Sequence, residues 1–242
     1  MMDRESGKLY IVATPIGNLE DITLRALRVL KESDLILCED TRVTRRLLSK
    51  YEIQTSVKSY HHHTSQEKGQ QIISELLSGK NLALVTDAGT PGVSDPGNVL
   101  VEMAVQSGIQ VVPIPGASAL AALVSVAGID MQKFVFLGFP PHKKGRETFF
   151  KEVATSKHPV MYYESPHRVL KNLELLQSLC PEFDSGTESN SDKRKCSGKR
   201  IIVGRELTKV FEETVRGDVS EVIEYYKSNS GKVKGEFVMI AY

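Results

Sequence analysis

The amino-acid sequence predicts an α/β protein of two α/β domains. The first has a mostly parallel sheet with helices on both faces, and the second has a mixed sheet. Short apolar runs alternate with helical patterns in the first half of the chain, and such alternation builds a parallel sheet covered by helices. From about residue 130 this alternation of apolar runs and helical patterns changes. We therefore expect an N-terminal domain over residues 1–120 and a C-terminal domain over residues 121–242.

Each predicted element of the N-terminal domain follows from its apolar spacing. The expected strands are 9–13, 35–38, 82–85 and 111–114, and the expected helices are about 21–31, a short one after residue 42, 65–77, 98–106 and 120–126. In the first helix Leu24, Leu27 and Leu30 share one face and should be buried. Asn18 or Asp21 is expected to cap this helix.

The C-terminal domain is expected to contain strands at 134–137, 159–163, 201–203, 211–215 and 236–241. A polar helix should separate the first two strands, and further helices are expected at 169–179 and 219–226. Residues 184–199 are polar, charged and rich in Ser, which predicts a flexible surface insertion. The sequence shows no internal repeats.

Composition excludes several classes of protein. The chain has 242 residues and a net charge of +1, so a nucleic-acid partner would be held by local patches rather than by a global field. No segment approaches the roughly 20 apolar residues of a membrane span, and the N-terminus lacks the apolar core of a signal peptide. Three cysteines without metal-type spacing favour reduced thiols and a cytoplasmic location.

No metal site is predicted. The run His61-His62-His63 resembles a metal-binding tract, but adjacent residues of a strand face opposite sides. No Cys, Asp or Glu stands at ligand spacing from it. A solvated loop, or contact with an acidic substrate, is the favoured interpretation.

The most informative segment is Thr86–Gly97, a loop of twelve residues with three glycines and two prolines. It follows an apolar strand and precedes a helix, which is where open α/β sheets bind ligands through backbone N–H groups. Ordinary turns of this kind take two to six residues. The length and composition of the loop therefore predict a binding element.

Two shorter turns also follow predicted strands. The segment 14–21 contains Pro15 and Gly17, and the segment 115–118 ends in Ser118 at the start of a helix. Neither has the GxGxxG pattern of a dinucleotide site or the Gly-Lys-Ser/Thr of a P-loop. Ser118 suits either a ligand or a plain helix cap.

Two charged clusters end further predicted strands, at 39–42 and 164–168. Acids and arginines at strand ends are candidates for substrate orientation and proton handling. Thr41 and Ser165 are also natural helix caps. Both interpretations hold at once.

These motifs, taken in order, closely resemble the tetrapyrrole methylase superfamily, the class III S-adenosylmethionine (SAM) methyltransferases. Within it they resemble the branch that places a 2′-O-methyl group on a cytidine in the decoding region of bacterial small-subunit (16S) ribosomal RNA. The resemblance spans about residues 8–241, and its motifs are 13–21, 38–42, 87–97, 113–120, 163–168 and 205–209.

The resemblance implies a homodimer and SAM bound in a cleft between the two domains. By motif, the SAM-binding residues are Pro15, Gly17, Gly89, Thr90, Pro91, Val93, Ser118, Ala119, Met161, Tyr162 and Gly235. The expected partner is 16S rRNA or the small ribosomal subunit, with no membrane and no metal. Many relatives continue beyond the position of Tyr242, and relatives more often show His-Glu-His at residues 61–63.

A ribose hydroxyl is a poor nucleophile, so methyl transfer needs a proton acceptor. We expect Asp40 or Glu164 in this role, with His167 third. Guanidinium groups bind phosphates bidentately, so Arg42 and Arg168 are expected to hold RNA. The remaining expected RNA contacts form a basic lip, Lys143, Lys144 and Arg146.

Two alternatives stay open. A tetrapyrrole C-methyltransferase of the uroporphyrinogen or precorrin type would share the cofactor site, although the motifs at 38–42 and 163–168 argue against it. A non-catalytic RNA-binding or assembly factor would keep the fold without turnover.

Overall fold

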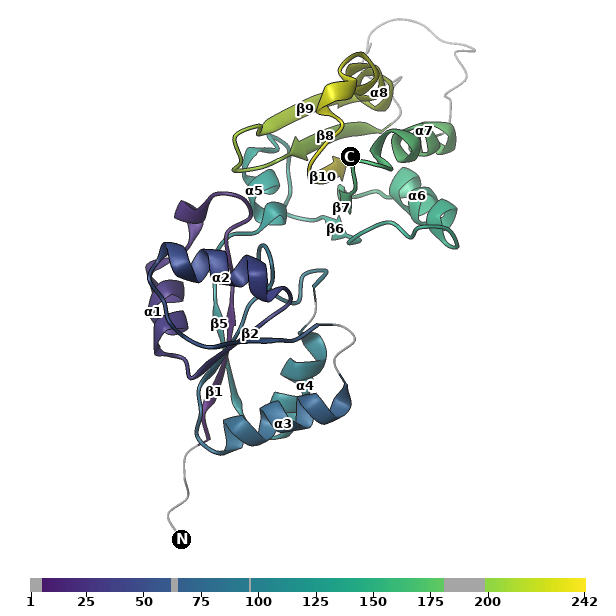
Figure 1. Ribbon diagram of the computed structural model, residues 1–242. Helices are drawn as coiled ribbons and strands as arrows, with labels where there is room; N and C mark the ends of the chain where they lie inside the picture. Colours follow the sequence, from purple (N-terminus) through teal and green to yellow (C-terminus); the bar gives the residue numbers. More distant parts are fainter. Residues whose placement is uncertain (1–5, 62–64, 96, 181–198) are drawn as a thin grey trace, which may run out of the picture. The chain divides into compact units, whose positions relative to one another are not determined.

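Two five-stranded sheets organise the chain. The computed structural model describes residues 6–61, 65–95, 97–180 and 199–242, and its contacts divide the chain into an N-terminal unit, Met1–Ala119, and a C-terminal unit, Leu120–Tyr242 (Figure 1). One sheet is parallel and the other is mixed, which confirms the predicted fold class.

The N-terminal sheet has the strand order β3-β2-β4-β1-β5, and all its pairs are parallel. Its strands are β1 (Lys8–Val12), β2 (Leu35–Cys38), β3 (Val57–Ser59), β4 (Leu82–Leu84) and β5 (Gln110–Ile114). In the central register Leu9 of β1 lies between Leu82 and Val111. The sequence analysis missed β3, because three residues with one apolar side chain give no periodic signal.

Helices cover both faces of this sheet (Figure 1). The helices α1 (Leu24–Glu32) and α2 (Thr41–Lys50) pack against one face, and α3 (Gln66–Leu77) and α4 (Asn98–Gln106) pack against the other. In α1 the buried residues are Ala26, Val29 and Leu30, whereas Leu24 is 86% exposed. The predicted Leu24–Leu27–Leu30 face was therefore wrong at its first residue, because the face that packs in the core runs through Ala26, Val29 and Leu30.

Side-chain caps fix where these helices begin. Thr23 accepts a hydrogen bond from the backbone N–H of Ala26 and caps α1, whereas Asn18 caps a short 3₁₀ helix, η1 (Leu19–Asp21). Neither Asn18 nor Asp21 caps α1, which corrects the prediction. Asp40, not Thr41, caps α2 by accepting from the N–H of Arg42. A carboxylate at this position also suits the positive end of the helix dipole.

The C-terminal sheet has the order β6-β7-β10-β8-β9, and only the β6–β7 pair is parallel. Its strands are β6 (Val135–Phe136), β7 (Val160–Glu164), β8 (Arg200–Arg205), β9 (Glu213–Asp218) and β10 (Phe237–Ala241). The central strand β10 is buried along its whole length, as its unbroken apolar sequence requires.

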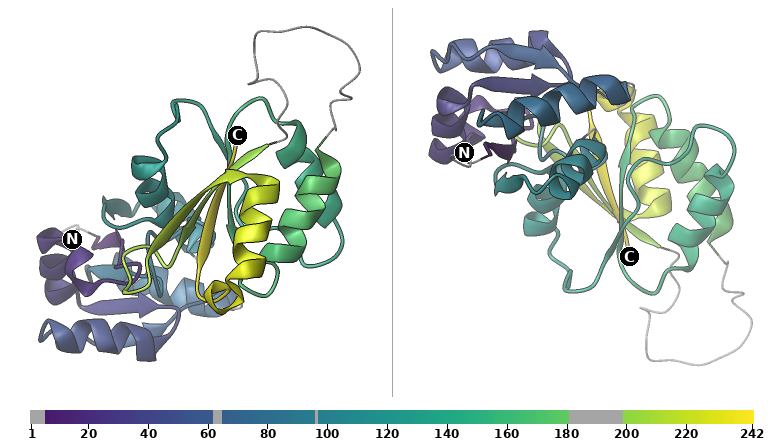
Figure 2. Two further views of the ribbon diagram at one scale, coloured as in Figure 1. Left: turned by 90° about the horizontal axis from the view of Figure 1, so that it is seen from above. Right: turned by 90° about the horizontal axis from the view of Figure 1, so that it is seen from below.

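Three helices, α6 (Arg146–Thr155), α7 (Val169–Leu179) and α8 (Val219–Ser228), share one core with this sheet. In Figure 2 these helices, coloured green and yellow, lie together on one side of the strands. The helix α5 (Ala119–Val126) contacts the sheet separately, since a Cβ at Gly204 of β8 would lie 2.9 Å from Leu123. A short 3₁₀ helix, η2 (Ser230–Lys232), precedes β10. The predicted insertion at 184–199 lies outside the described residues except for Lys199, as do His62 and His63.

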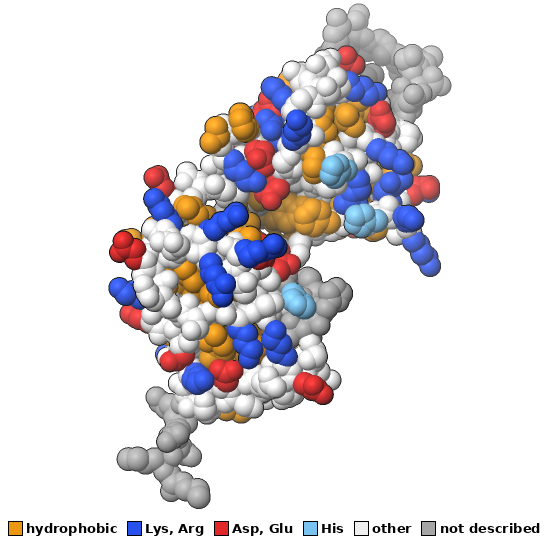
Figure 3. Space-filling model, in the orientation of Figure 1, with side chains coloured by type: hydrophobic (Ala, Val, Ile, Leu, Met, Phe, Trp, Pro, Cys, Tyr) orange, Lys and Arg blue, Asp and Glu red, His pale blue; other side chains and the backbone are white. Residues whose placement is uncertain are grey.

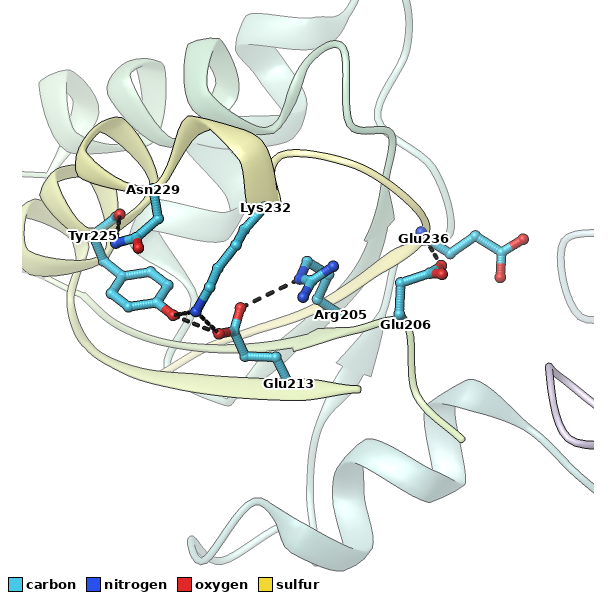
Figure 4. A network of polar contacts seen from close by, with 7 residues as sticks. All are labelled: Arg205, Glu206, Glu213, Tyr225, Asn229, Lys232 and Glu236. Atoms are coloured by element: carbon cyan, nitrogen blue, oxygen red, sulfur yellow. Dashed lines mark hydrogen bonds and ion pairs between the residues drawn. The ribbon is translucent and has the colours of Figure 1, made fainter. Parts of the chain in front are cut away.

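A polar network fixes the edge of the C-terminal sheet (Figure 4). Glu213 of β9 accepts from Arg205 Nε at 3.3 Å, from the Tyr225 hydroxyl at 2.5 Å and from Lys232 Nζ at 2.5 Å. The ammonium of Lys232 lies 5.0 Å from the centroid of the Tyr225 ring. This carboxylate therefore joins β8, β9, α8 and η2. Hydrogen bonds to a charged group are stronger than neutral ones, so these contacts stabilise the edge of the sheet.

Adjacent tyrosines of α8 offer a test of this network. Tyr226 is fully buried, and its hydroxyl has no hydrogen-bond partner among the described residues. Tyr226→Phe should leave stability unchanged or raise it by about 1 kcal/mol, because an unpaired buried hydroxyl costs free energy. Tyr225→Phe should lower it by about 1–2 kcal/mol, because Glu213 loses a donor. Urea unfolding curves measure both, and equal losses in the two variants would contradict this account.

Candidate functional site

Three turns meet at the carboxyl edge of the N-terminal sheet. The backbone groups of Thr14, after β1, and Gly89, after β4, exchange two hydrogen bonds of 2.9 and 3.0 Å. The Thr14 hydroxyl donates to the carbonyl of Thr86 at 3.1 Å. The Thr90 hydroxyl donates to the carbonyl of Ala117, after β5, at 3.2 Å. The turns that the sequence singled out as separate motifs therefore form one connected structure, the turn cluster (14–17, 86–95 and 115–118).

Backbone conformation explains why glycine occupies two positions of the loop Thr86–Gly97, which we call the long loop. Gly89 has a φ of +83° and Gly97 a φ of +143°, which residues with a Cβ rarely adopt. A Cβ at Gly97 would also lie 2.8 Å from a methyl group of Leu84. The non-glycine Ser94 has a φ of +65°. Such strain persists only where the surrounding structure holds it, and it concentrates at functional sites.

The predicted SAM-binding residues of the N-terminal unit all lie in the turn cluster or directly after it, at Ala119. Gly17 is exposed, as are Pro115 and Gly116 of the third turn. The half-buried members are Thr90, Val93, Ser118 and Ala119, and the buried ones are Pro15, Gly89 and Pro91. The cluster thus exposes Gly and Pro positions, where no long side chain shields the main chain.

The predicted SAM-binding residues of the C-terminal unit have other local roles. Met161 and Tyr162 are buried in β7, where the ring of Tyr162 packs edge-on against Phe149 and Phe150. Gly235 has a φ of +85°, and a Cβ there would lie 2.3 Å from the carboxyl group of Glu206.

The carboxylate of Glu206 explains the turn at Gly235. It accepts from the N–H of Glu236 at 2.9 Å and from Lys209 Nζ at 2.8 Å (Figure 4 shows the contact with Glu236). Glycine at position 235 is therefore required by the local structure alone, both by its φ and by the space that Glu206 occupies.

Asp40 and Arg42 form one unit at the end of β2. The Arg42 guanidinium donates to both carboxylate oxygens, with Nη2 to Oδ2 at 2.6 Å, and the Arg42 N–H donates at 2.8 Å. These bonds lower the pKa of Asp40 to about 2. A carboxylate with so low a pKa is a weak base. The Asp40 N–H donates to Asp87 Oδ1 at 3.0 Å, which joins the 39–42 segment to the turn cluster.

Glu164 lies buried at the end of β7. It accepts from Asn172 Nδ2 at 2.5 Å and from the N–H of Ser165 at 2.7 Å, and Arg168 Nε lies 3.5 Å away. Burial raises the pKa of Glu164, against these donors. Arg168 also donates to the Ser165 hydroxyl at 3.1 Å. Ser165 accepts from Arg168 but does not cap α7, which begins four residues later, so that prediction was wrong.

The other predicted substrate residues lie on the surface of the C-terminal unit. His167, Lys143 and Lys144 are exposed, and Arg146 is half-buried at the start of α6. Arg168 donates to the carbonyl of Pro140 at 2.9 Å, which joins the β7–α7 turn to the β6–α6 loop that bears Lys143 and Lys144. The predicted RNA residues of this unit therefore come from two connected segments.

Asp95 is a site residue that the sequence analysis did not select. It is half-buried in the long loop and makes no hydrogen bond or ion pair with a described residue. Burial, followed by the charges of Glu39 and Asp87, raises its pKa to about 6. The only sequence signal was its place in the loop, because nothing in a sequence shows that three acids from two strand ends approach one another.

Within the described part of the chain, no group of three or more His, Cys, Asp and Glu side chains is arranged to hold a metal ion. None of the helices described there combines the length and apolar character of a membrane span.

The fold and the turn cluster define a class of protein. The chain belongs to the Tetrapyrrole (Corrin/Porphyrin) Methylases, whose sequence profile matches residues 8–223. It is therefore a methyltransferase, and the methyl donor of its family is SAM.

Its relatives within the family are more specific. A ribosomal RNA small subunit methyltransferase I of Halalkalibacterium halodurans is 40% identical over 98% of this chain and 76% of the relative. Proteins of the same name from Leptospira biflexa and Bacillus subtilis are 42% and 40% identical over 98% of the chain, and over 91% and 75% of their own lengths.

Solved structures show the same fold at low identity. A cobalt precorrin-4 methyltransferase, a cobalamin biosynthetic enzyme, matches with a TM-score of 0.67 and 18% identity over 97% of this chain and 94% of the other. A uroporphyrin-III-C-methyltransferase from Thermus thermophilus matches with a TM-score of 0.61 and 17% identity, over 97% and 94%.

The turn cluster fits SAM. A methionine carboxylate and an adenine edge both bind to backbone groups, and exposed Gly and Pro positions let such a ligand approach the main chain. The hydrogen bonds between Thr14, Gly89, Thr90 and Ala117 hold the three turns together.

The raised pKa of Asp95 predicts a pH-dependent stability. Because the folded-state pKa of about 6 lies above the ordinary 3.8, the folded protein loses stability as the pH rises from about 4 to 6, and the loss is complete above pH 6. Asp95→Asn should therefore raise stability at pH 7.5 by about 1 kcal/mol, after allowance for solvent screening, and by less at pH 5. Thermal melts at both pH values test this, with Glu102→Gln, an exposed acid on α4, as the control. An unchanged or lower Tm at pH 7.5 would disprove the account.

Proposed function

We propose that this protein transfers a methyl group from SAM to the 2′-oxygen of a cytidine in the decoding region of small-subunit (16S) ribosomal RNA. The observation that carries the proposal is the identity of 40–42%, over 98% of the chain, to proteins named ribosomal RNA small subunit methyltransferase I. The cytidine and its 2′-oxygen come from the motif resemblance.

The structure supports a division of labour. We propose that the turn cluster holds the methyl donor and that the basic residues of the C-terminal unit hold RNA, together with Arg42. SAM supplies the electrophilic methyl group when bound. The protein then has to align the ribose oxygen with it, and such positioning contributes about 7–11 kcal/mol to the lowering of a barrier.

The structure orders the candidate proton acceptors. Asp40 is the weakest base, with a pKa of about 2, and its oxygens already accept from Arg42. Glu164 has a raised pKa, but only 1% of its side chain is exposed. His167 is exposed beside Arg168, and histidine is the side chain that most often transfers protons in enzymes. We therefore propose His167 as the acceptor, with Asp40 positioning Arg42 and Glu164 positioning Arg168.

We propose a homodimer from the family resemblance. We also propose a cytoplasmic location, because the proposed substrate is ribosomal RNA. Methylation of a tetrapyrrole is disfavoured. Four solved methyltransferases that share the fold are 16–18% identical to this chain, and such an identity supports the fold without supporting a shared substrate.

The proposed reaction is tested with purified protein and labelled SAM. Small subunits from cells that lack the protein should accept the label at a cytidine 2′-oxygen. Small subunits from normal cells should not, because the site is already methylated there. Mapping of 2′-O-methylation in the two RNA samples locates the nucleotide. Uroporphyrinogen serves as the alternative substrate, and its methylation in place of RNA would overturn the proposal.

The acceptor is tested by substitution. His167→Gln should lower kcat by about 10²–10⁴-fold with SAM affinity unchanged, because proton transfer to a positioned base contributes that range. Asp40→Asn and Glu164→Gln should mainly raise KM for RNA, because each loosens an arginine. Calorimetry with SAM verifies that every variant is folded. A wild-type kcat in His167→Gln would show that another group accepts the proton.

A further inference from the structure

An aromatic side chain lies exposed among the basic residues of the C-terminal unit. Phe139 is 53% exposed, in the loop between β6 and α6. Burying a Phe side chain is worth roughly 1.5–3 kcal/mol, so an exposed ring in an ordered loop leaves that free energy available to a partner. We call Phe139, His142, Lys143, Lys144, His167 and Arg168 the aromatic–basic patch.

The ring is held in place from beneath. The Phe139 ring lies 5.2 Å from that of Tyr163, at an interplanar angle of 50°, and Tyr163 contacts Phe136 edge-on at 5.1 Å. The N–H of Tyr163 donates to the carbonyl of Gly138 at 2.9 Å, beside the exposed residue. A ring fixed in this way is already ordered before it binds, which lowers the entropic cost of binding.

Positive charge flanks the ring. Lys143 and Lys144 are exposed and form no ion pair with any residue that the structure describes. The Arg168 guanidinium is fixed by the carbonyl of Pro140, next to Phe139. His142 and His167 are also exposed. In Figure 3, Lys, Arg and His side chains gather beside exposed hydrophobic atoms on the C-terminal unit, over the region of α6 and α7.

This combination identifies the chemistry of the partner. An ordered aromatic face binds a flat ring by stacking, and uncompensated cations bind phosphates. Proteins that hold single-stranded nucleic acid combine these two features, and bases splayed out of RNA stack on aromatic side chains. An apolar peptide would not require the cations, and duplex RNA offers no base face to stack.

We propose that the aromatic–basic patch binds single-stranded RNA, with one base stacked on Phe139 and the neighbouring phosphates held by Lys143 and Lys144. This inference rests on the proposed function and adds to it, because it requires the substrate nucleotides to be unpaired. A base on Phe139 would also place its ribose and phosphate close to Arg168, which is anchored to the adjacent Pro140.

The chain contains a matched control. Phe211 is 71% exposed in the β8–β9 loop, but Glu212 and Glu213 follow it in sequence, and the nearby Lys209 is paired with Glu206 and Glu236. It has the same ring and similar exposure without the positive charge. Phe211→Ala should therefore leave RNA binding unchanged.

The test measures binding of a fluorescent single-stranded RNA of about 12 nucleotides by anisotropy, over a range of salt concentrations. Phe139→Ala should weaken binding by about 5- to 100-fold, and Phe139→Trp should retain it, because a stacked base contributes about that much. The salt dependence should not change in Phe139→Ala. It should become shallower by about 0.7 per lost phosphate contact in Lys143→Gln/Lys144→Gln.

Turnover separates this inference from the proposed function. With small subunits as substrate, Phe139→Ala should raise KM more than it lowers kcat, with SAM affinity and Tm unchanged. If the wild type methylates RNA and Phe139→Ala binds and turns over like Phe211→Ala, the patch does not bind RNA. If the wild type transfers no methyl group to RNA but binds the oligonucleotide through Phe139, the proposed function fails and the patch stands. Preference for a duplex over the single strand would also overturn the proposal.

Discussion

One backbone contact organises the N-terminal unit, the pair of hydrogen bonds between Thr14 and Gly89. The strands that lead into it are parallel, yet these two residues pair in the antiparallel sense, because both chains turn as they leave the sheet. Gly89 adopts the positive φ that this turn demands. Without the pair, the long loop would have to be ordered by other contacts, at an entropic cost of roughly 1–2 kcal/mol for each residue fixed.

The charged residues at the strand ends form local pairs. Asp40 holds Arg42, and buried Glu164 lies against Arg168. In both cases the acid and the arginine come from one short segment, so each guanidinium is oriented before any substrate arrives. Orientation of this kind favours a phosphate contact, since a planar fork that is already fixed loses less entropy on binding. The bonds to Arg42 also lower the pKa of Asp40, which makes it a poorer proton acceptor than the sequence suggested, whereas Glu164 is hidden from a substrate by its burial.

Asp95 differs from these acids because no cation among the described residues compensates its charge. Proteins retain a half-buried, unpaired carboxylate at a cost in stability. The strained backbone of Ser94 lies beside it. Ser94 and Asp95 both lower the stability of the folded protein, so stability alone does not explain the long loop. A binding role for the turn cluster, of which this loop is part, is consistent with that cost.

The sequence by itself determined the order of the elements apart from β3, the class of each sheet and the positions of the turns. Apolar strands, helical spacing and Gly/Pro turns are local signals, which is why β2 and α4 begin and end where the sequence placed them. It also determined the family, because the motifs are long and occur in order.

The tertiary structure decided which residues meet. That Thr90 contacts Ala117, that Asp87 binds the N–H of Asp40, and that Phe139 stacks on Tyr163 depend on strand order and register. The burial of Tyr162 and the exposure of Leu24 likewise follow from which side of a strand or helix faces a neighbour. Residue types show which chemistry is available, whereas only the packed chain shows which groups are already paired and which are left to bind a partner.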